Sequence, residues 1–269
     1  MTLLKFKNEV ERNIKRLAKN KMLAESTKIW FERGLSNKYS YNFSSYSVPI
    51  IQYPQDMIAI QELIWEIKPD LIIETGIAHG GSLIQSASIL AMIEYQEAAL
   101  SNSFLNPAKP YRKVLGIDID IRKHNKKIIG AHFLSKRIDM IEGSSVSKKV
   151  IKSVYKYAKE YSNILVLLDS NHTHEHVLAE LKAYTPLVAK NSYCVVYDTI
   201  IEDLPKKQFP NRPWGPGNNP KTAIHQFLKL LKKDALVGVD GNKLKFKVNK
   251  SIEAKLQITV ASGGYLKRI

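Results

Sequence analysis

Short apolar runs alternate with longer amphipathic segments from residue 57 onward. Continuous apolar runs of this length are typical of parallel strands buried on both faces, whereas apolar positions repeating every three or four residues indicate helices. The expected strands cover residues 71–74, 114–118, 138–141, 164–169 and 193–198, followed by two last strands at 236–239 and 256–260. The expected helices include residues 57–67, 82–97, 174–184 and 222–231. This alternation predicts an α/β fold with a doubly wound, mostly parallel seven-stranded sheet of Rossmann-like type.

The N-terminal part of the chain departs from this alternation. Residues 3–33 space their apolar positions by three and four among many lysines and arginines, which predicts an N-terminal helical extension of one or two amphipathic helices. Residues 35–49 are rich in Ser, Tyr and Asn and indicate a loop placed to act as a substrate lid. We therefore expect an arm with a lid loop at 1–50 and one larger domain at 51–269.

Composition fits a globular protein of the reducing interior of a cell. The 269 residues are 44% apolar and suffice for a sizeable core. A single cysteine, Cys194, excludes an intrachain disulfide and fits a reducing compartment. The first residues lack the apolar stretch of a signal peptide, and no apolar run approaches the ~20 residues that a membrane span needs. We therefore expect a cytoplasmic protein.

The formal net charge of +16 raises the question of an anionic partner. Nucleic acid, anionic lipid and a phosphate-bearing substrate would all fit this charge. The lysines are dispersed and few aromatic residues interleave with them, so a basic solvated surface explains the charge equally well. No base-flipping or RNA-binding aromatic motif occurs, which disfavours nucleic acid. Peripheral contact of the basic arm with a membrane stays open, and we expect a homo-oligomer.

An acidic residue stands at or beside the end of each of the first five expected strands. These residues are Glu74, Asp118, Glu142, Asp169 and Asp198. Ligands of open α/β sheets bind outside the carboxyl ends of the strands. A buried carboxylate is costly unless it is paired or bound to a cation, so one shared ligand site explains the set better than chance. Any single acid could instead cap the helix that follows it.

The first of these strands leads into a glycine-rich turn that also begins a helix. The turn consists of Glu74, Gly76, His79, Gly80, Gly81 and Ser82 with the residues between them. Glycine lets a ligand approach the backbone, and the free N–H groups of a helix start favour an anionic ligand group. The acid two residues before Gly76 favours a cationic group instead, and the spacing is not the G-x-G-x-x-G of dinucleotide sites. S-adenosylmethionine (SAM), which carries an ammonium, a carboxylate and a sulfonium, fits this turn. His79 is placed to contact the cofactor or the substrate, or to face solvent.

The next two strand ends would complete a SAM site. Asp118 directly ends the second apolar run, where a carboxylate can accept both ribose hydroxyls, and we prefer it to the nearby Asp120. Ser144 and Ser145 follow the third strand, where the adenine edge would lie. A ribose-binding acid would suit NAD equally well, so the choice of SAM depends on the glycine turn.

The fourth and fifth strand ends indicate a metal. Asp169 and Asp198 would lie on neighbouring strands and repel each other unless a cation lay between them. Mg²⁺ or another hard divalent cation takes oxygen ligands, and Thr199 offers a hydroxyl beside Asp198 as a further metal ligand. Tyr197 offers a phenol, which leaves the third ligand open. Such a metal would bind a substrate hydroxyl and lower its pKa.

His172 is the expected general base of this site. It lies three residues after Asp169, on the loop that leaves the fourth strand, and histidine side chains titrate near neutrality. We assign catalytic roles to His172 and Asp169 and expect His174 and His176 on the helix surface or in its first turn.

A second loop and the C-terminal tail are further candidates. The loop 212–220 carries Arg212 and Trp214, which could stack on a sugar and grip an anion, although a purely structural turn is an equal alternative. The tail 263–268 is expected to close the last strand and to bring Tyr265 near the site.

Together these motifs resemble the cephalosporin hydroxylase family, which also contains rhamnosyl O-methyltransferases. The matching segments are residues 68–82, 116–120, 142–145, 168–172, 198–199 and 263–268. The resemblance implies a class I SAM-dependent methyltransferase fold, SAM at the first three segments and a divalent metal at Asp169 and Asp198. The chain also resembles catechol-type O-methyltransferases, in which a metal pair and a base follow the same strands. It departs from the antibiotic-modifying members in one place, because Tyr197 stands where an acid is expected beside Asp198.

The leading hypothesis is a SAM- and Mg²⁺-dependent O-methyltransferase that acts on a hydroxyl. The expected acceptor is a small molecule or glycan, nucleotide-linked or phosphorylated, with a sugar of a surface polysaccharide or glycolipid as the first choice. One alternative is a nucleic-acid methyltransferase or RNA-binding protein. Another is an iron-dependent hydroxylase, although only His172 and His174 come near the pattern of an iron triad.

Overall fold

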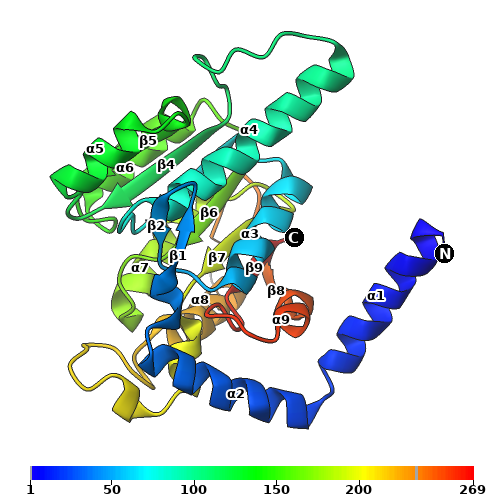
Figure 1. Ribbon diagram of the computed structural model, residues 1–269. Coiled ribbons are helices and arrows are strands. Elements are labelled where there is room, and N and C mark those ends of the chain that lie inside the picture. The colour runs from blue at the N-terminus through cyan, green and yellow to red at the C-terminus, as the bar shows by residue number, and fades with distance from the viewer. Residues whose placement is uncertain (1, 234–235) are drawn as a thin grey trace.

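A seven-stranded sheet forms the centre of the computed structural model, which describes residues 2–233 and 236–269 (Figure 1). The first five strands of this sheet along the chain are parallel, and each lies where an apolar run predicts it. They are β3 (Leu71–Thr75), β4 (Lys113–Asp118), β5 (Ile138–Glu142), β6 (Ile164–Leu168) and β7 (Tyr193–Val196). The order is β5-β4-β3-β6-β7-β9-β8, so the sheet grows first to one side of β3 and then to the other. The predicted doubly wound, mostly parallel sheet is confirmed.

The last two strands lie elsewhere than predicted. They are β8 (Phe246–Val248) and β9 (Tyr265–Arg268), and β9 runs antiparallel to both of its neighbours. Residues 236–239 contain only an isolated bridge. Leu256 ends the short helix α9 (Lys250–Leu256), and residues 257–260 follow it without strand structure. The prediction at 256–260 was wrong because apolar and polar residues can alternate in a buried loop as they do in a strand. Here the Thr259 hydroxyl and the Val260 N–H donate to the Asp56 carboxylate instead of to a neighbouring strand.

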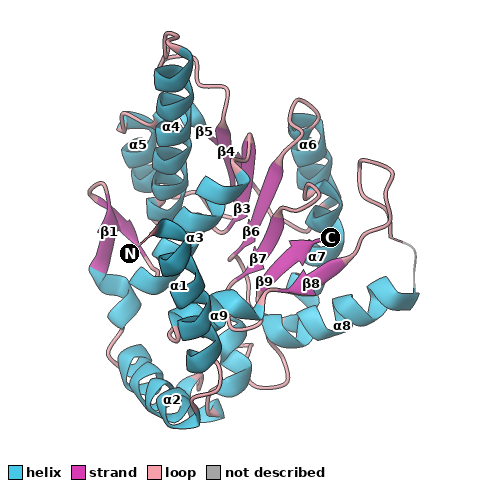
Figure 2. Ribbon diagram, turned by 90° about the vertical axis from the view of Figure 1, so that its right-hand side faces the viewer, coloured by secondary structure: helices cyan, strands magenta, loops and turns pink. Residues whose placement is uncertain are grey.

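Helices cover both faces of the sheet (Figure 2). One layer holds α3 (Pro54–Ile67), α4 (Gly81–Ser101) and α5 (Lys123–Ala131), and the other holds α6 (Lys148–Ala158), α7 (His174–Tyr184) and α8 (Pro220–Lys233). Successive side chains of a strand point to opposite faces. Ile72 therefore packs with the first layer, whereas Leu71 and Ile73 pack with the second. Of these helices, α6 was not predicted.

The expected N-terminal arm consists of α1 (Leu3–Leu17) and α2 (Lys21–Ser36), and α1 packs beside α9 (Figure 1). Each helix begins at a capping residue, because the side chains of Thr2 and Asn20 accept hydrogen bonds from N–H groups of the first turns. No residue of α1 is buried, but Phe31 of α2 stacks on Tyr53 with ring centroids 4.8 Å apart. Among the described helices, the arm included, none has the length and apolar character that crossing a lipid bilayer requires.

Residues 35–49 contain more regular structure than the predicted loop. The short 3₁₀ helix η1 (Tyr39–Asn42) leads into a hairpin of β1 (Phe43–Ser45) and β2 (Val48–Ile50). Its two turn residues, Tyr46 and Ser47, have φ angles of 45° and 70°. Such turns usually carry Asn-Gly or Asp-Gly, and the sequence has neither pair here, which is why the hairpin was missed.

The parallel strands end at a common edge. Thr75 pairs in register with Ile117 on one side and with Leu168 on the other, and Leu168 in turn pairs with Val196. The acidic residues that end or follow these strands therefore come out at the same edge of the sheet, where the candidate site lies.

Candidate active site

Asp169, His172 and Asp198 form a cluster just beyond β6 and β7. Each offers one ligand atom, and these atoms all lie within 4.8 Å of one another. His172 Nε2 lies 3.1 Å from Asp198 Oδ2, and the Nε2 of Gln52 donates to Asp169 Oδ2 over 3.0 Å. Asp198 has a left-handed backbone (φ 54°), which Asp tolerates better than most residues, at the sharp turn into the 3₁₀ helix η4 (Thr199–Asp203).

The electrostatics of this cluster favour a bound cation. Burial, and next the charge of Asp198, raise the pKa of Asp169 well above its usual value. A divalent cation would relieve this repulsion, and the two carboxylates supply the oxygen ligands that Mg²⁺ prefers. Within the described residues, the cluster holds one histidine and two carboxylates, unlike the two histidines and one carboxylate typical of non-haem iron. The donor set therefore fits a hard divalent metal.

The glycine turn lies against this cluster through close backbone approaches. A Cβ on Gly76, which has a φ of 89°, would lie 2.1 Å from the carbonyl oxygen of Asp169. A Cβ on Gly81 would lie 2.3 Å from the carbonyl oxygen of Pro49, just ahead of the end of β2. Glycine is required at both positions because the neighbouring backbone leaves no room for a Cβ. The turn therefore packs tightly between the hairpin and the loop at Asp169.

The turn and the end of β4 line a small cavity of about 150 Å³. Ile77 and Ala78 donate their N–H groups to Asp118 Oδ2 over 2.8 and 3.3 Å, so Asp118 also organises the turn. Ser82 donates its hydroxyl hydrogen to Glu74 Oε1, whereas Glu74 Oε2 is buried and has no hydrogen-bond partner among the described residues. Burial raises the pKa of Glu74 to about 7. Glu74 lies behind Ser82 and is not among the residues that line the cavity. Its orphaned carboxylate oxygen at this turn would suit a ligand with an ammonium group that reached it.

A second cavity of about 160 Å³ continues from the first past Gly76 and Asp118 to Ser144 and Ser145. Asp118 and the two serines are thus brought together as predicted. His176 lies in the first turn of α7, as predicted, but it also lines this cavity, and its Nε2 lies 3.0 Å from Ser145 Oγ, a contact that was not predicted. Its spacing of four residues from the buried Glu180, 3.5 Å away, is the signal that could have identified it.

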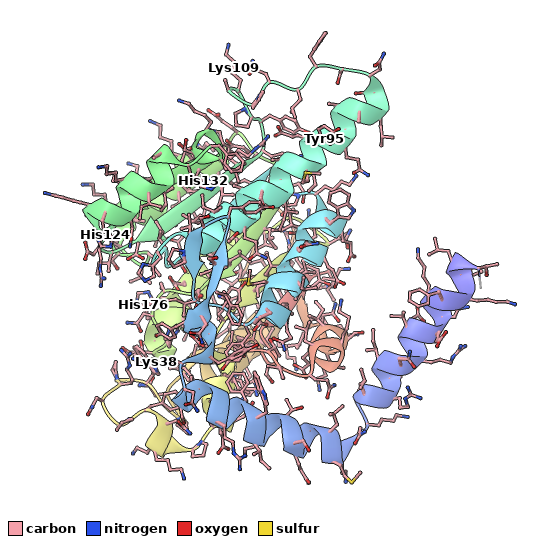
Figure 3. The ribbon with its side chains drawn as sticks, in the orientation of Figure 1. Lys38, Tyr95, Lys109, His124, His132 and His176 are labelled. Atoms are coloured by element: carbon pink, nitrogen blue, oxygen red, sulfur yellow. The ribbon has the colours of Figure 1, made fainter. Side chains whose placement is uncertain are left out.

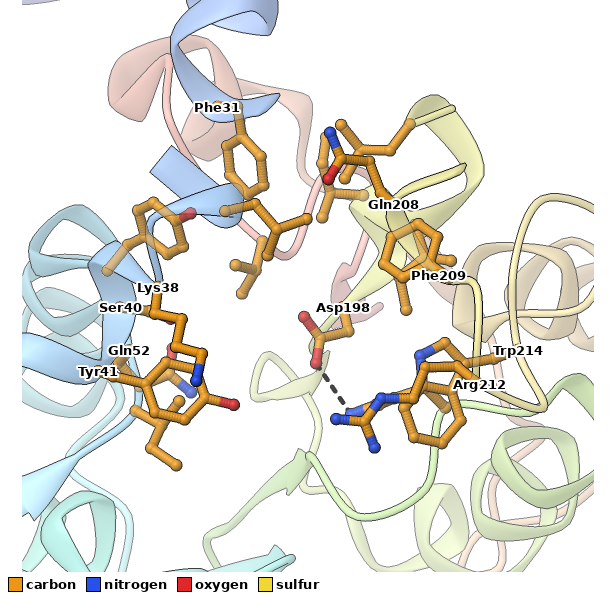
Figure 4. A pocket seen from close by; sticks show the side chains of 18 of the residues that line it. Phe31, Lys38, Ser40, Tyr41, Gln52, Asp198, Gln208, Phe209, Arg212 and Trp214 are labelled. Atoms are coloured by element: carbon orange, nitrogen blue, oxygen red, sulfur yellow. Dashed lines mark ion pairs between the residues drawn. The ribbon is translucent and has the colours of Figure 1, made fainter. Parts of the chain in front are cut away.

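A larger cavity of about 390 Å³ lies on the other side of Asp169 (Figure 4). Its floor is the cluster of Asp169, His172 and Asp198. Asp169 and Gln52 also line the cavity at the glycine turn, so the two spaces adjoin at these residues. One wall comes from the arm and the predicted lid, and the opposite wall comes from the loop after β7 (Figure 4).

Trp214 connects this loop to the cluster. Its ring meets the His172 ring edge-on with centroids 4.8 Å apart, and the Arg212 guanidinium lies 5.2 Å from the centre of the Trp214 ring. The loop residues singled out in the sequence therefore line the large cavity and fix the position of the expected base.

Several candidates take other positions. The Thr199 hydroxyl is buried, bonds the carbonyl oxygens of Val260 and Ser262, and does not line the large cavity. This supports a structural role, and we leave Thr199 out of the metal site proposed below. Tyr197 is also buried and lines none of the cavities described above, and Tyr265 donates to Asp56 Oδ1 over 2.9 Å. The rings of His174 and His79 differ: His174 bonds Thr222 and Gln226, whereas His79 lines the turn cavity.

Two lining residues, Gln52 and Lys38, were not predicted from the sequence. Gln52 is only 7% exposed, and its Oε1 has no hydrogen-bond partner within the described ranges. It reaches the cluster from a position 117 residues before Asp169, and no local sequence pattern predicts such a contact. Figure 3 shows Lys38 on the same side of the molecule as His176.

Comparison with known proteins relates the chain to sugar-modifying enzymes. Rhamnosyl O-methyltransferases of Mycobacterium bovis and Mycobacterium leprae are each 30% identical over 151 residues, which is 56% of this chain. The match covers 54% and 57% of those relatives, so the chain spans about half of their length.

Solved structures show the same fold at low identity. A structure of CmcI with Mg and SAM has a TM-score of 0.50 at 15% identity and covers 85% of this chain and 77% of that one. An O-methyltransferase from Bacillus cereus in complex with SAH, the demethylated product of SAM, also has a TM-score of 0.50, at 14% identity, and covers 93% of this chain and 91% of that one. These neighbours are class I methyltransferases by fold. A family model described as Rhamnosyl O-methyltransferase/CmcI matches residues 37–269, and the chain therefore belongs to this family.

Proposed function

We propose that the protein is a SAM-dependent O-methyltransferase that uses a divalent metal, with Mg²⁺ as the first choice. The observation that carries this proposal is the meeting of two cavities at Asp169 and Gln52. One cavity has the glycine turn and ribose-type carboxylate of a nucleoside site, and the other has a carboxylate–histidine floor suited to a hydroxyl. The names of the relatives, and the Mg and SAM of the CmcI structure, support the same activity.

The residues of the turn would bind and orient the cofactor. Glu74 would pair with the ammonium group, Asp118 would accept the ribose hydroxyls, and Ser144 and Ser145 would border the adenine. SAM, when bound, supplies an electrophilic methyl group whose C–S bond breaks as the new C–O bond forms, with the electron pair left on sulfur. Because the reaction is one in-line displacement, positioning by these residues accounts for much of the rate.

The floor of the large cavity would prepare the acceptor. Asp169 and Asp198 would hold the metal, and a divalent cation, when bound, lowers the pKa of a hydroxyl. His172 would take the hydroxyl proton and pass it to solvent. Asp198, 3.1 Å from His172 Nε2, and the edge-on Trp214 ring would fix the imidazole in place.

We further infer that the acceptor hydroxyl belongs to a sugar, within a surface polysaccharide or glycolipid. The aromatic side chains Phe31, Tyr41, Phe209 and Trp214 line the large cavity, and aromatic faces suit the apolar faces of sugar rings. Residues 1–50 would then serve as arm and lid of a catalytic domain at 51–269, since Phe31, Lys38 and Tyr41 belong to the cavity wall.

The test separates the cofactor site from the metal–base site. Asp169→Ala and His172→Ala should abolish formation of SAH from SAM with a rhamnoside acceptor, while calorimetry still detects SAM binding. His225→Ala, an exposed histidine of α8, should behave as wild type. Wild-type turnover in both site variants would show that the metal–base assignment is wrong, and no SAM binding by the wild type would refute the enzyme class.

A further inference from the structure

Two cationic side chains, Lys38 and Arg212, point into the large cavity from opposite walls (Figure 4). Lys38 immediately precedes η1, and Arg212 lies in the loop after β7. In the described part of the chain, neither side chain makes a hydrogen bond or an ion pair, and Arg212 stacks on Trp214 instead. Both cations therefore face the space in which the acceptor would lie.

The charges that line the cavity do not balance once a metal is present. Its described lining holds two carboxylates, Asp169 and Asp198, and two permanent cations, Lys38 and Arg212. The carboxylates lie at the floor with His172 and Gln52, where we place the divalent cation. With that cation bound, the charges at the floor cancel, and no carboxylate of the described lining is left to pair with the two exposed cations on the walls. An anionic group on the acceptor would supply the missing charge.

The chemistry of the two walls favours a phosphate. The planar guanidinium of Arg212 offers paired donors that match phosphate oxygens, and its stacking on Trp214 limits its freedom before binding. Lys38 supplies a point charge from the other wall, which suits a group with several anionic oxygens. Gln208 and Tyr41 lie on the same walls and add uncharged donors.

We propose that the acceptor is a sugar joined to a phosphate or diphosphate, and that Lys38 and Arg212 bind this group. The sugar hydroxyl would then lie at the floor, between the two walls. This inference rests on the proposed function, because it assumes a metal and an acceptor in this cavity. Nucleotide-linked and lipid-linked sugars share this group, and the experiment distinguishes the two.

The experiment measures binding by calorimetry with the full chain, Mg²⁺ and SAH at fixed concentrations. The probes are dTDP-rhamnose, a short-chain prenyl diphosphate-rhamnose and the neutral methyl rhamnoside. Lys38→Gln and Arg212→Gln should each weaken binding of at least one phosphate-linked probe about 10-fold to 100-fold and change the neutral probe less than about twofold. Lys38→Arg should restore most of the affinity. Lys207→Gln, an exposed lysine of the same loop, is the matched control and should bind as wild type.

The tighter of the two phosphate-linked probes identifies the source of the sugar. Equal affinity of the wild type for charged and neutral probes would overturn the inference, as would glutamine variants that bind both phosphate-linked probes within about twofold of wild type. Formation of SAH is measured in parallel. Charge-dependent binding without any methyl transfer would refute the proposed function and leave the phosphate site standing. Methyl transfer to the phosphate-linked probes that neither substitution changes would refute the phosphate site and leave the proposed function standing.

Discussion

Glu74→Gln should make the protein more stable above neutral pH and at the same time weaken its binding of SAM. The carboxyl of Glu74 is 2% exposed, one of its oxygens has no hydrogen-bond partner within residues 2–233 and 236–269, and burial raises its pKa to about 7. An ionised carboxylate in this position is costly in the free protein. The same charge is what would attract the ammonium group of the cofactor.

The size of the effect follows from proton linkage. The folded protein holds the Glu74 proton up to about pH 7, whereas the unfolded chain releases it near the ordinary value of 4.5. The free energy of unfolding is therefore largest below pH 4.5, falls as the pH rises to about 7, and is level above it. The loss amounts to roughly 3 kcal/mol. A glutamine cannot ionise and should not show this part of the slope.

Urea denaturation of wild type and Glu74→Gln between pH 5 and 8 measures the difference. Asp56, with a pKa raised by burial to about 6, also makes stability fall as the pH rises, but it does so in both proteins and cancels in the comparison. Asp169 acts in the same direction, and loss of the Glu74 charge should lower its pKa, which adds to the advantage of the variant. We expect similar stability near pH 5 and an advantage of roughly 2–3 kcal/mol for the variant at pH 8. Calorimetry should show SAM affinity of the wild type rising with pH up to about 7, and an affinity about 10-fold to 100-fold lower in the variant.

Two results would refute this reasoning. Parallel stability curves for the two proteins between pH 5 and 8 would show that Glu74 titrates alike in the folded and unfolded states. Unchanged SAM affinity in Glu74→Gln would remove Glu74 from the cofactor site even if the stability curves diverged as expected.

Two further predictions concern the scaffold. Gly81→Ala should lower stability by about 1–3 kcal/mol in thermal unfolding, because the new Cβ would lie 2.3 Å from the Pro49 carbonyl oxygen; Gly130→Ala, whose Cβ would meet nothing within 4 Å, is the control, and equal losses would contradict the steric cause. Arg137→Ala should lower the free energy of unfolding by about 3–5 kcal/mol in urea denaturation, because it leaves the carboxylate of the buried Glu94, 2.5 Å from the Arg137 guanidinium, without its cationic partner. Lys255→Ala, which breaks an exposed pair with Glu62, should cost below about 1 kcal/mol, and a similar cost for both pairs would contradict this assignment.

The parallel strands and their acidic ends could be predicted because their signals are local. Every residue of β3 and β6 is buried, so the apolar residues of each strand appear in the sequence as an unbroken run. The acid that follows each run, Glu74 or Asp169, marks the edge where ligands bind. Asp169, His172 and Asp198 could be proposed as partners for the same reason, since neighbouring parallel strands end side by side.

The rest depended on contacts between distant parts of the chain or on unusual local conformations. Gln52 reaches the site from a segment with no signature of its own, and no pattern singled out Lys38 within the predicted lid. The Thr199 hydroxyl donates to the carbonyl oxygen of Val260, a contact between distant parts of the chain. Tyr46 and Ser47 form a hairpin turn without glycine. At the C-terminus, hydrogen bonds to Asp56 replace a strand partner, so an alternating pattern does not become a strand.

The family match begins at residue 37, yet Phe31, Leu35 and Ser36 of α2 belong to the wall of the large cavity. Part of the wall against which an acceptor would lie is thus formed by residues outside the family match. Under the proposed function, exchange of the segment before residue 37 would change this part of the wall and leave the edge of the sheet unchanged. For protein engineering, Ser36 is the position at which the wall can be varied, because Phe31 and Leu35 also pack in or against the core.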